Sequence, residues 1–338
     1  MMPTRGRAIT SVVVLVMIAL SGAVIGRGAD AGSSPSRAAK LVERVRTATE
    51  QTNFTGVVTV SWRTAGGARQ HASVDVRAAN GVVEVSSDDH LVLDDGGHTF
   101  LKDDLGWSSP VSEPAAKDRP APDARWRLSV QAGTLDGREV STVVARRANG
   151  SVAMRLVVDD DTSLPLARQV LDQHGKVLRA YAFESLDVQP AGTAAAAAAV
   201  PNTSTRTATA VRDVPAGYHA PARAGAGYTL LSRSRHDDGL HLVYSDGLFT
   251  VSITEQRGEL DWDSMPSGAV ATDVDGVHAR RYSEASGDVL VWERDGVVYT
   301  CVSDAPTDVL AAMVAGLTPD RSLPTQVADF VLGPFGFD

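Results

Sequence analysis

The chain has 338 residues, a formal net charge of −9 and a sequence pI near 5.4. This length leaves room for two domains of ordinary size after an export signal. Phosphate binding depends mainly on clustered Lys and Arg, so the acidic balance argues against a nucleic-acid partner and is typical of a solvated surface.

The first 31 residues have the pattern of an export signal. Arg5 and Arg7 precede an uncharged run, Ile9 to Ile25, and Ala29-Asp30-Ala31 supplies a small-x-small cleavage pattern. The run is shorter than the roughly 20 residues that a membrane span needs, which favours cleavage. We therefore expect an exported protein, periplasmic or extracytoplasmic, with a cleaved signal. A tether formed by an uncleaved N-terminal segment is the alternative.

One helix followed by many short strands is predicted for residues 36–189. Apolar residues recur at helical spacing in residues 36–52, and from Asn53 the period becomes two, so that Phe54, Gly56, Val58, Val60 and Trp62 face one side of a strand. Further strands, separated by Gly, Asn and Asp turns, are predicted at residues 82–85, 91–93, 99–102, 126–130, 140–146, 152–158, 167–172 and 177–183. The predicted class is α+β, with one helix on a long, curled antiparallel sheet that has a concave apolar face.

The composition changes at residue 190. An Ala/Thr/Pro-rich linker is predicted over residues 190–216, a second α+β domain over residues 217–318 and a tail over residues 319–338. The second domain has predicted strands at 228–234, 240–244, 248–255, 269–274, 277–283, 288–294 and 297–302, and one helix at 305–317. Cys301, the only cysteine, lies in an alternating segment, where we expect a buried strand residue.

No catalytic, cofactor-binding or metal-binding motif is found. Gly-x-Ser-x-Gly, His-Glu-x-x-His, the Walker loop and the dinucleotide fingerprint are all absent from the sequence. The run Asp159 to Asp161 lacks the alternating ligands of a calcium loop and is typical of a turn. We therefore predict no enzyme activity, no catalytic residue, no metal site and no cofactor. A hydrolase with an unrecognised site is the weakest of the alternatives.

Two stretches resemble a known family. Residues 158–188 contain an acidic turn, Thr-x-Leu-Pro-Leu, a strand, a Gly turn and a strand ending in Phe-x-x-Leu. This stretch resembles lipoprotein carriers of the LolA type and the first domain of the RseB/MucB regulators. The stretch Tyr244-Ser245-Asp246-Gly247-Leu248-Phe249 resembles the signature of the RseB/MucB C-terminal domain, which simple carriers lack. By local physics alone this stretch predicts a hairpin turn, in which Tyr244 and Phe249 either build the core or contact a partner.

The resemblance implies a LolA/LppX-like unclosed β-barrel that senses lipid or lipoprotein acyl chains, followed by a domain that binds the extracytoplasmic part of a membrane-spanning anti-sigma factor. The protein would then be a negative regulator of an envelope-stress sigma factor. A lipid or lipoprotein carrier of the LolA type is the alternative function. The tryptophans of the first domain fill its core or, as a set, line an acyl cleft. Candidate cleft residues are Phe54, Val58, Val60, Trp62, Trp107, Trp126, Leu156 and Val158.

Overall fold

The computed structural model describes residues 36–87, 90–94, 98–103, 106–112, 125–189, 209–210, 213–236, 239–274, 276–285 and 287–317. The predicted export signal, residues 190–208 and 211–212 of the predicted linker, and the predicted tail lie outside these ranges. In the described ranges, no helix is long and apolar enough to cross a membrane.

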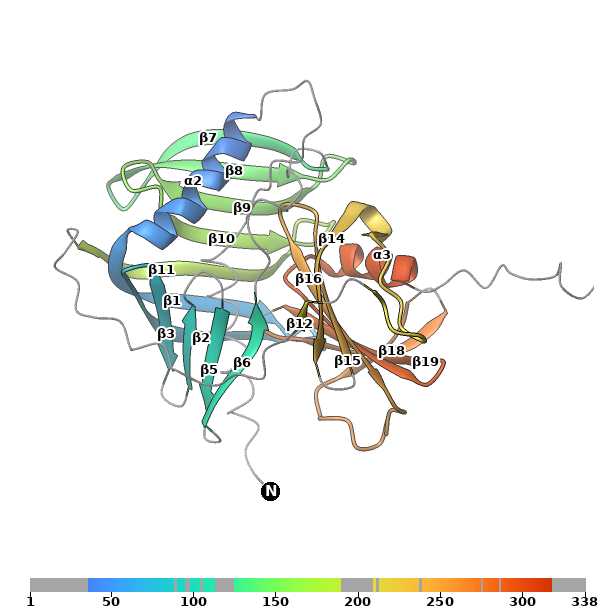
Figure 1. Ribbon diagram of the computed structural model, residues 1–338. Coiled ribbons are helices and arrows are strands. Elements are labelled where there is room, and N and C mark those ends of the chain that lie inside the picture. Colours follow the sequence, from blue (N-terminus) through green and yellow to red (C-terminus); the bar gives the residue numbers. More distant parts are fainter. Residues whose placement is uncertain are drawn as a thin grey trace, which may run out of the picture.

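Residues 37–189 form one open antiparallel sheet with a helix on one face, which we call the N-terminal unit (Figure 1). Its strand order is β6-β5-β4-β3-β2-β1-β11-β10-β9-β8-β7. The end strands β6 and β7 pair only with β5 and β8 among the described residues, so the sheet is unclosed, as predicted. The elements are α2 (Arg37–Gln51), β1 (Asn53–Arg63), β2 (Arg69–Ala79), β3 (Val82–Ser87), β4 (His90–Asp94), β5 (His98–Asp103), β6 (Gly106–Ser112), β7 (Arg127–Leu135), β8 (Arg138–Arg146), β9 (Val152–Asp159), β10 (Pro165–Leu171) and β11 (Val177–Gln189).

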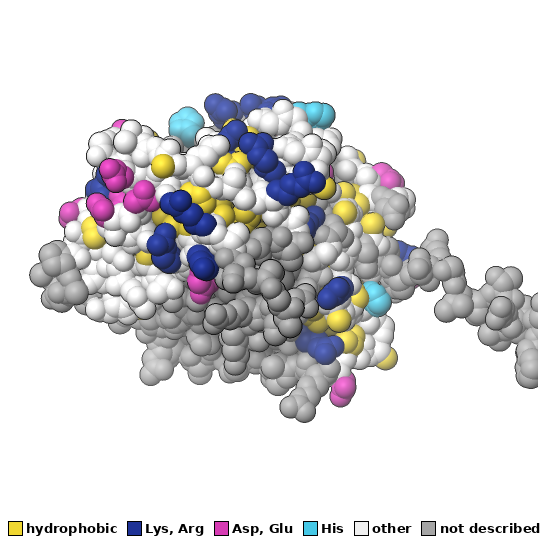
Figure 2. Space-filling model, turned by 90° about the horizontal axis from the view of Figure 1, so that it is seen from above, with side chains coloured by type: hydrophobic (Ala, Val, Ile, Leu, Met, Phe, Trp, Pro, Cys, Tyr) yellow, Lys and Arg dark blue, Asp and Glu magenta, His cyan; other side chains and the backbone are white. Residues whose placement is uncertain are grey.

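Helix α2 forms where the sequence predicts it and crosses strands on one face of the sheet (Figure 1). The hydroxyl of Ser36 caps its first turn by accepting a hydrogen bond from the backbone N–H of Ala39 at 3.1 Å. Its apolar stripe, including Leu41, Val42 and Val45, is buried against side chains of β8, β9 and β10. Figure 2 shows Lys and Arg side chains spread over the face seen from above, although the chain as a whole is acidic.

Residues 209–317 form a second antiparallel sheet with one helix, which we call the C-terminal unit. Its strand order is β12-β14-β15-β16-β20-β19-β18-β17, with β13 beside β14. Strand β12 lies inside the predicted linker and pairs with β14, so this part of the segment belongs to the sheet. The elements are β12 (Thr209–Ala210), β13 (Arg223–Ala224), η3 (Gly225–Gly227), β14 (Tyr228–His236), β15 (Gly239–Ser245), β16 (Thr250–Arg257), β17 (Val270–Val274), β18 (Val277–Ser283), β19 (Asp288–Arg294), β20 (Val297–Ser303) and α3 (Thr307–Leu317).

The two units share a core. One cluster of buried apolar side chains begins under α2, includes β8 to β10, and continues into β14 to β20 and α3 of the C-terminal unit. A second cluster lies on β1 to β4 and includes Phe54, Val58 and Val85. Because buried apolar contacts stabilise an arrangement roughly in proportion to their area, the continuous first cluster holds the two units together.

Candidate functional site

The stretch Tyr244 to Phe249 forms the tight turn between β15 and β16, and all six residues are buried. One carboxylate oxygen of Asp246, Oδ1, accepts hydrogen bonds from the backbone N–H groups of Leu248 at 3.0 Å and Phe249 at 2.9 Å. The hydroxyl of Ser245 donates to the carbonyl oxygen of Phe249 and accepts from the N–H of Gly247. Gly247 has φ +87°, a conformation that suits glycine. The predicted hairpin turn is confirmed, and the motif satisfies its own backbone groups.

The second carboxylate oxygen of Asp246 faces the N-terminal unit. Oδ2 accepts a hydrogen bond from Trp126 Nε1 at 3.0 Å and lies 3.1 Å from Arg125 Nη1. The Arg125 guanidinium also lies over the rings of Trp126 and Tyr228, at 5.1 and 5.2 Å from their centroids. Burial raises the pKa of Asp246, against the opposing effects of Arg125, the two backbone amides and Trp126. The turn therefore holds a buried carboxylate in a fixed orientation toward the other unit.

Phe249, the last residue of the motif, also contacts the N-terminal unit. Its ring packs edge-on against Trp126, with centroids 5.4 Å apart and planes at 71°. The Arg168 guanidinium lies 5.5 Å from the centroid of the Phe249 ring. The Tyr244 hydroxyl, in contrast, donates to the carbonyl oxygen of Pro221 within its own unit, at 3.0 Å. Asp246 and Phe249 thus contact the other unit, while Tyr244 builds the unit to which it belongs.

A second group of ionic contacts joins the same two units where β20 ends. Arg168 Nη2 lies 2.7 Å from Asp304 Oδ2, and the other oxygen of Asp304 accepts from the N–H of Thr250 at 2.9 Å. Arg179 donates to the carbonyl oxygens of Asp304 at 3.2 Å and Ala305 at 2.8 Å. Its Nη1 also lies 3.5 Å from Asp288 Oδ1. All these charged side chains are almost fully buried.

The ion pairs between the units have a consistent polarity. In each pair that the described residues form across the junction, the arginine belongs to the N-terminal unit and the aspartate to the C-terminal unit. A fourth pair, between Arg147 and Asp308 at 3.1 Å, lies nearer the solvent. Buried ion pairs contribute little net stability because desolvation offsets their attraction, but an unpaired buried charge is strongly unfavourable. The junction therefore favours the relative orientation of the units in which these charges stay paired.

Six of the eight predicted cleft residues lie on the inner face of the N-terminal sheet, the face that carries α2. Phe54, Val58, Val60 and Trp62 belong to the cluster on β1 to β4, and none of them is more than 7% exposed. Trp126, Leu156 and Val158 belong to the cluster shared with α2 and the C-terminal unit. Trp107 lies on β6, and its side chain is outside the described part of the chain. In this structure the described members of the set are core residues divided between two clusters.

The arginines of the junction lie between these two clusters on the same face. Arg179 on β11 is the cross-strand partner of Trp62 on β1, and Arg168 on β10 is the partner of Leu156 on β9. Side chains of directly opposed residues lie on the same face of a sheet. Ala285, in the turn between β18 and β19 of the C-terminal unit, is fully buried within the cluster on β1 to β4. The C-terminal unit therefore covers part of the inner face.

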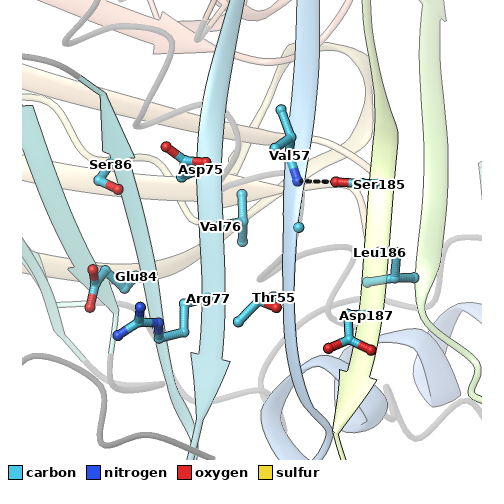
Figure 3. Close-up of a pocket in the computed structure, with 11 residues that line it drawn as sticks. Thr55, Val57, Asp75, Val76, Arg77, Glu84, Ser86, Ser185, Leu186 and Asp187 are labelled. Carbon is cyan, nitrogen blue, oxygen red and sulfur yellow. Dashed lines mark hydrogen bonds between the residues drawn. The ribbon is translucent and has the colours of Figure 1, made fainter.

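An open hollow of about 540 Å³ lies on the opposite, outer face of the sheet (Figure 3). Side chains of β1, β2, β3 and β11 line it, including Asp75, Arg77, Glu84 and Asp187. The hydroxyl of Ser185 accepts a hydrogen bond from the N–H of Val57 at its edge. Most of the lining side chains are polar or charged, which does not suit an acyl chain. None of the predicted cleft residues lines it.

The described residues show no arrangement for metal chemistry, because they contain no cluster of three or more His, Cys, Asp or Glu side chains that could hold an ion. Asp159 caps its own turn instead, accepting from the N–H and hydroxyl of Thr162 at 2.8 and 2.9 Å. Cys301 is fully buried in β20, as predicted, and burial raises the pKa of its thiol well above the usual range.

The junction arginines were not among the residues singled out from the sequence. Arg168 interrupts an otherwise apolar alternation on β10, with Leu166 and Val170 buried on either side of it. A charged residue at an inward position of a strand is the one local signal that could have indicated them. Arg125 lies next to Trp126, which was singled out for its ring alone.

No protein-family profile and no curated protein sequence matches the chain. The chain is similar in structure to MucB, with a TM-score of 0.46 and 18% identity over 84% of this chain and 98% of that chain. Two complexes, MucB with MucA(peri) and the Pseudomonas aeruginosa MucA/MucB complex, each align with a TM-score of 0.45 and 17% identity. These alignments cover 84% of this chain and 100% and 98% of theirs.

Proposed function

We propose that this protein is an extracytoplasmic negative regulator of an alternative, envelope-stress sigma factor. In this proposal it binds the extracytoplasmic domain of a membrane-spanning anti-sigma factor. The observation that carries the proposal is the position of the motif Tyr244 to Phe249, which is buried where a second sheet joins the open one through Asp246 and Phe249. A carrier that works with the open sheet alone needs no such junction. We propose the domain limits 36–189 and 217–318, with a linker at 190–216 in which Thr209–Ala210 pairs with β14 of the second sheet.

We further propose that the inner face of the N-terminal unit senses lipid or lipoprotein acyl chains. Support comes from the predicted cleft residues, six of which (Phe54, Val58, Val60, Trp62, Leu156 and Val158) lie on this face. An acyl chain gains about 0.8 kcal/mol for each methylene that it buries against such a surface. Since these side chains are buried in the present structure, a ligand would have to take the place of something that now covers them.

In this proposal the protein is exported and works by binding, without a catalytic step. The export pattern of the first 31 residues supports the location, and cleavage of this signal remains our expectation. Any effect on the sigma factor would then pass through the membrane by way of the anti-sigma factor. Acyl binding would regulate that effect if the ligand binds the free protein better than the complex.

The test uses the mature chain from residue 32 and the extracytoplasmic segment of a single-span protein encoded beside a sigma-factor gene in the same genome. Calorimetry should show saturable binding, and the bound segment should resist a protease that cuts it when free. Absence of binding would refute the regulator. Saturating acyl ligand should weaken the complex, and equal affinity with and without ligand would refute the sensing step.

The lipid carrier is the second candidate, favoured by the open sheet and its apolar inner face. A carrier must exchange its cargo, so the full mature chain should then move a fluorescent lipid between vesicles. Rapid transfer together with no binding to the anti-sigma segment would favour the carrier over the regulator.

A further inference from the structure

Strand β7 forms one end of the N-terminal sheet, and half of its backbone groups face away from that sheet. The hairpin of β7 and β8 turns at Asp136 and Gly137, whose φ angles of 49° and 79° are typical of a two-residue type I′ turn. The residues next to such a turn, here Leu135 and Arg138, exchange backbone hydrogen bonds, and bonded pairs then alternate with non-bonded pairs along the strand. The N–H and C=O groups of every second residue of β7 therefore face outward: Leu128, Val130, Ala132 and Thr134.

A contact on the other side of the hairpin agrees with this assignment. The C=O of Glu139, the cross-strand partner of Thr134, accepts a hydrogen bond from the N–H of Asp160 at 3.0 Å. It therefore points away from β7, as expected in a non-bonded pair. Among the described residues, no strand pairs with β7 on its outer side. The outward groups thus form a free edge of the sheet.

This edge lacks the features that usually prevent a strand from pairing with another chain. Natural edge strands are short, or carry Pro, charged residues or bulges. Strand β7 has nine residues, no Pro and no charged residue after Arg127, and its register with β8 is unbroken. The other end strands that the structure describes have such features: β6 contains Pro110, β12 has two residues, and β17 has five, one of them Asp273. Of these end strands, β7 is the one best suited to pair with an added strand.

The surroundings of β7 carry positive charge on both faces of the sheet. Arg127 is exposed on β7, and its cross-strand partner Arg146 lies on the same face. On the other face, α2 begins next to β7, where Arg37 and Lys40 are exposed and the first turn has no acidic residue (Figure 1). The N-terminal end of a helix is itself positive. Figure 2 views the molecule from the side of β7 and shows Lys and Arg side chains gathered around apolar atoms.

This distribution of charge favours an acidic partner over a second copy of the chain. The exposed acidic residues of the hairpin, Asp136 and Glu139, lie at the turn, which is the end of β7 opposite Arg127. Carboxylates of an added strand are therefore attracted most strongly beside Arg127 and the start of α2. Pairing of β7 with β7 in one antiparallel sheet would bring two copies of the basic start of α2 to the same side, where like charges repel.

We propose that the free edge of β7 is a docking site for an extended, acidic segment of another protein, which adds a strand to the N-terminal sheet. The outward backbone groups of β7 bind the backbone of the segment, and its carboxylates bind Arg127 and the basic start of α2. Backbone pairing of this kind gives affinity, and the side chains of the added strand give specificity. The inference does not depend on the proposed function, because it requires neither the anti-sigma factor nor an acyl ligand.

The test uses the mature chain from residue 32 and a fluorescent peptide of about ten residues in which Glu alternates with Val, so that the carboxylates lie on one face of the strand. The control peptide has Lys in place of Glu. The protein should bind the Glu peptide saturably and the Lys peptide at least about tenfold more weakly. Hydrogen exchange, followed by NMR, should slow at the outward amides of Val130 and Ala132 when the Glu peptide binds. The amides of Ser129 and Gln131, which are bonded to β8, should be slow with or without peptide.

Two variants with matched controls separate backbone pairing from charge. Ala132→Pro removes an outward N–H, and its control Ala271→Pro makes the same change on β17, also three residues before the turn. Arg127→Glu reverses a charge beside the edge, and its control Arg69→Glu reverses an exposed charge on β2. Both β7 variants should weaken binding of the Glu peptide at least about tenfold, while the controls should leave it unchanged.

Absence of saturable binding would overturn the inference, and so would binding that Ala132→Pro and Arg127→Glu leave unchanged. Dimers in sedimentation, with the same outward amides protected in the absence of peptide, would assign the edge to a second copy and overturn the acidic partner. Failure of the protein to bind the anti-sigma segment would count only against the proposed function, because the peptide experiment does not use that segment.

Discussion

Replacing Asp246 with Asn tests whether the signature turn joins the two units. The two carboxylate oxygens have separate roles: Oδ1 accepts from the backbone of Leu248 and Phe249, and Oδ2 contacts Trp126 and Arg125. In Asp246→Asn the amide oxygen can keep the contacts within the turn. The amide nitrogen would then face the Trp126 N–H and the Arg125 guanidinium. Because all three groups are hydrogen-bond donors, no hydrogen bond can form between the amide nitrogen and the other two. The substitution therefore removes the contacts between the units and spares the turn.

The expected loss of stability follows from the geometry of the pair between Arg125 and Asp246. Opposite charges 3.1 Å apart attract by about 5 kcal/mol at an effective dielectric constant of about 20, before desolvation is subtracted. Breaking a buried pair by removing one partner costs about 3–5 kcal/mol, because the other charge is left uncompensated. Arg125 is partly exposed and can turn to water, so we expect about 3 kcal/mol. Because the two units share one core, we expect the native protein to unfold in a single transition in scanning calorimetry, and Asp246→Asn to split this transition into two.

Asp159→Asn is the matched control for this experiment. Asp159 is buried, accepts from Thr162 through Oδ1, and pairs with Arg138 at 3.1 Å through Oδ2, all within the N-terminal unit. The substitution Asp159→Asn should lower the stability of the N-terminal unit, while the two units still unfold together. The reasoning fails if Asp246→Asn unfolds in one transition at the native midpoint, or if Asp159→Asn also splits the transition.

Three further predictions concern single sites. Burial raises the pKa of Glu255 from 4.5 to about 7, so the protonated side chain favours folding, and this contribution to stability is lost as pH rises between those values. Urea midpoints should fall across this window in the native protein and fall less steeply in Glu255→Gln. Gly56→Ala should cost about 1–3 kcal/mol in urea unfolding, because a Cβ there would overlap the Ser185 carbonyl, whereas Gly133→Ala, with open space around it, should be nearly neutral. Cys301 should react with a thiol reagent only at the rate of unfolding, and rapid modification of the native protein would contradict its burial.

The sequence predicted most elements of the fold within a few residues of their observed ends. Alternation was a reliable guide where large apolar residues recur, as in β1, and helical spacing identified α2 and α3. Strands β2 and β6 and the two-residue strands β12 and β13 were not predicted. In β2 the inward residues include Val74, Val76 and Ala78, but charged and polar residues occupy most of the rest of the segment, so its average hydrophobicity is low. Such a strand is recognised only once its neighbours pair with it.

The sequence by itself determined the local structure of the motif at residues 244–249. Asp, Gly and Ser form this turn through contacts with their own backbone, and such contacts are encoded by neighbours in the chain. The tertiary structure alone decided what the turn contacts, because Trp126 and Asp246 lie 120 positions apart and Arg168 and Asp304 lie 136 apart. The periodic patterns in the sequence report on neighbouring residues and cannot predict contacts between residues so far apart in the chain. The burial of these charges, and the cover that the C-terminal unit forms over part of the inner face, follow from how the two sheets pack together.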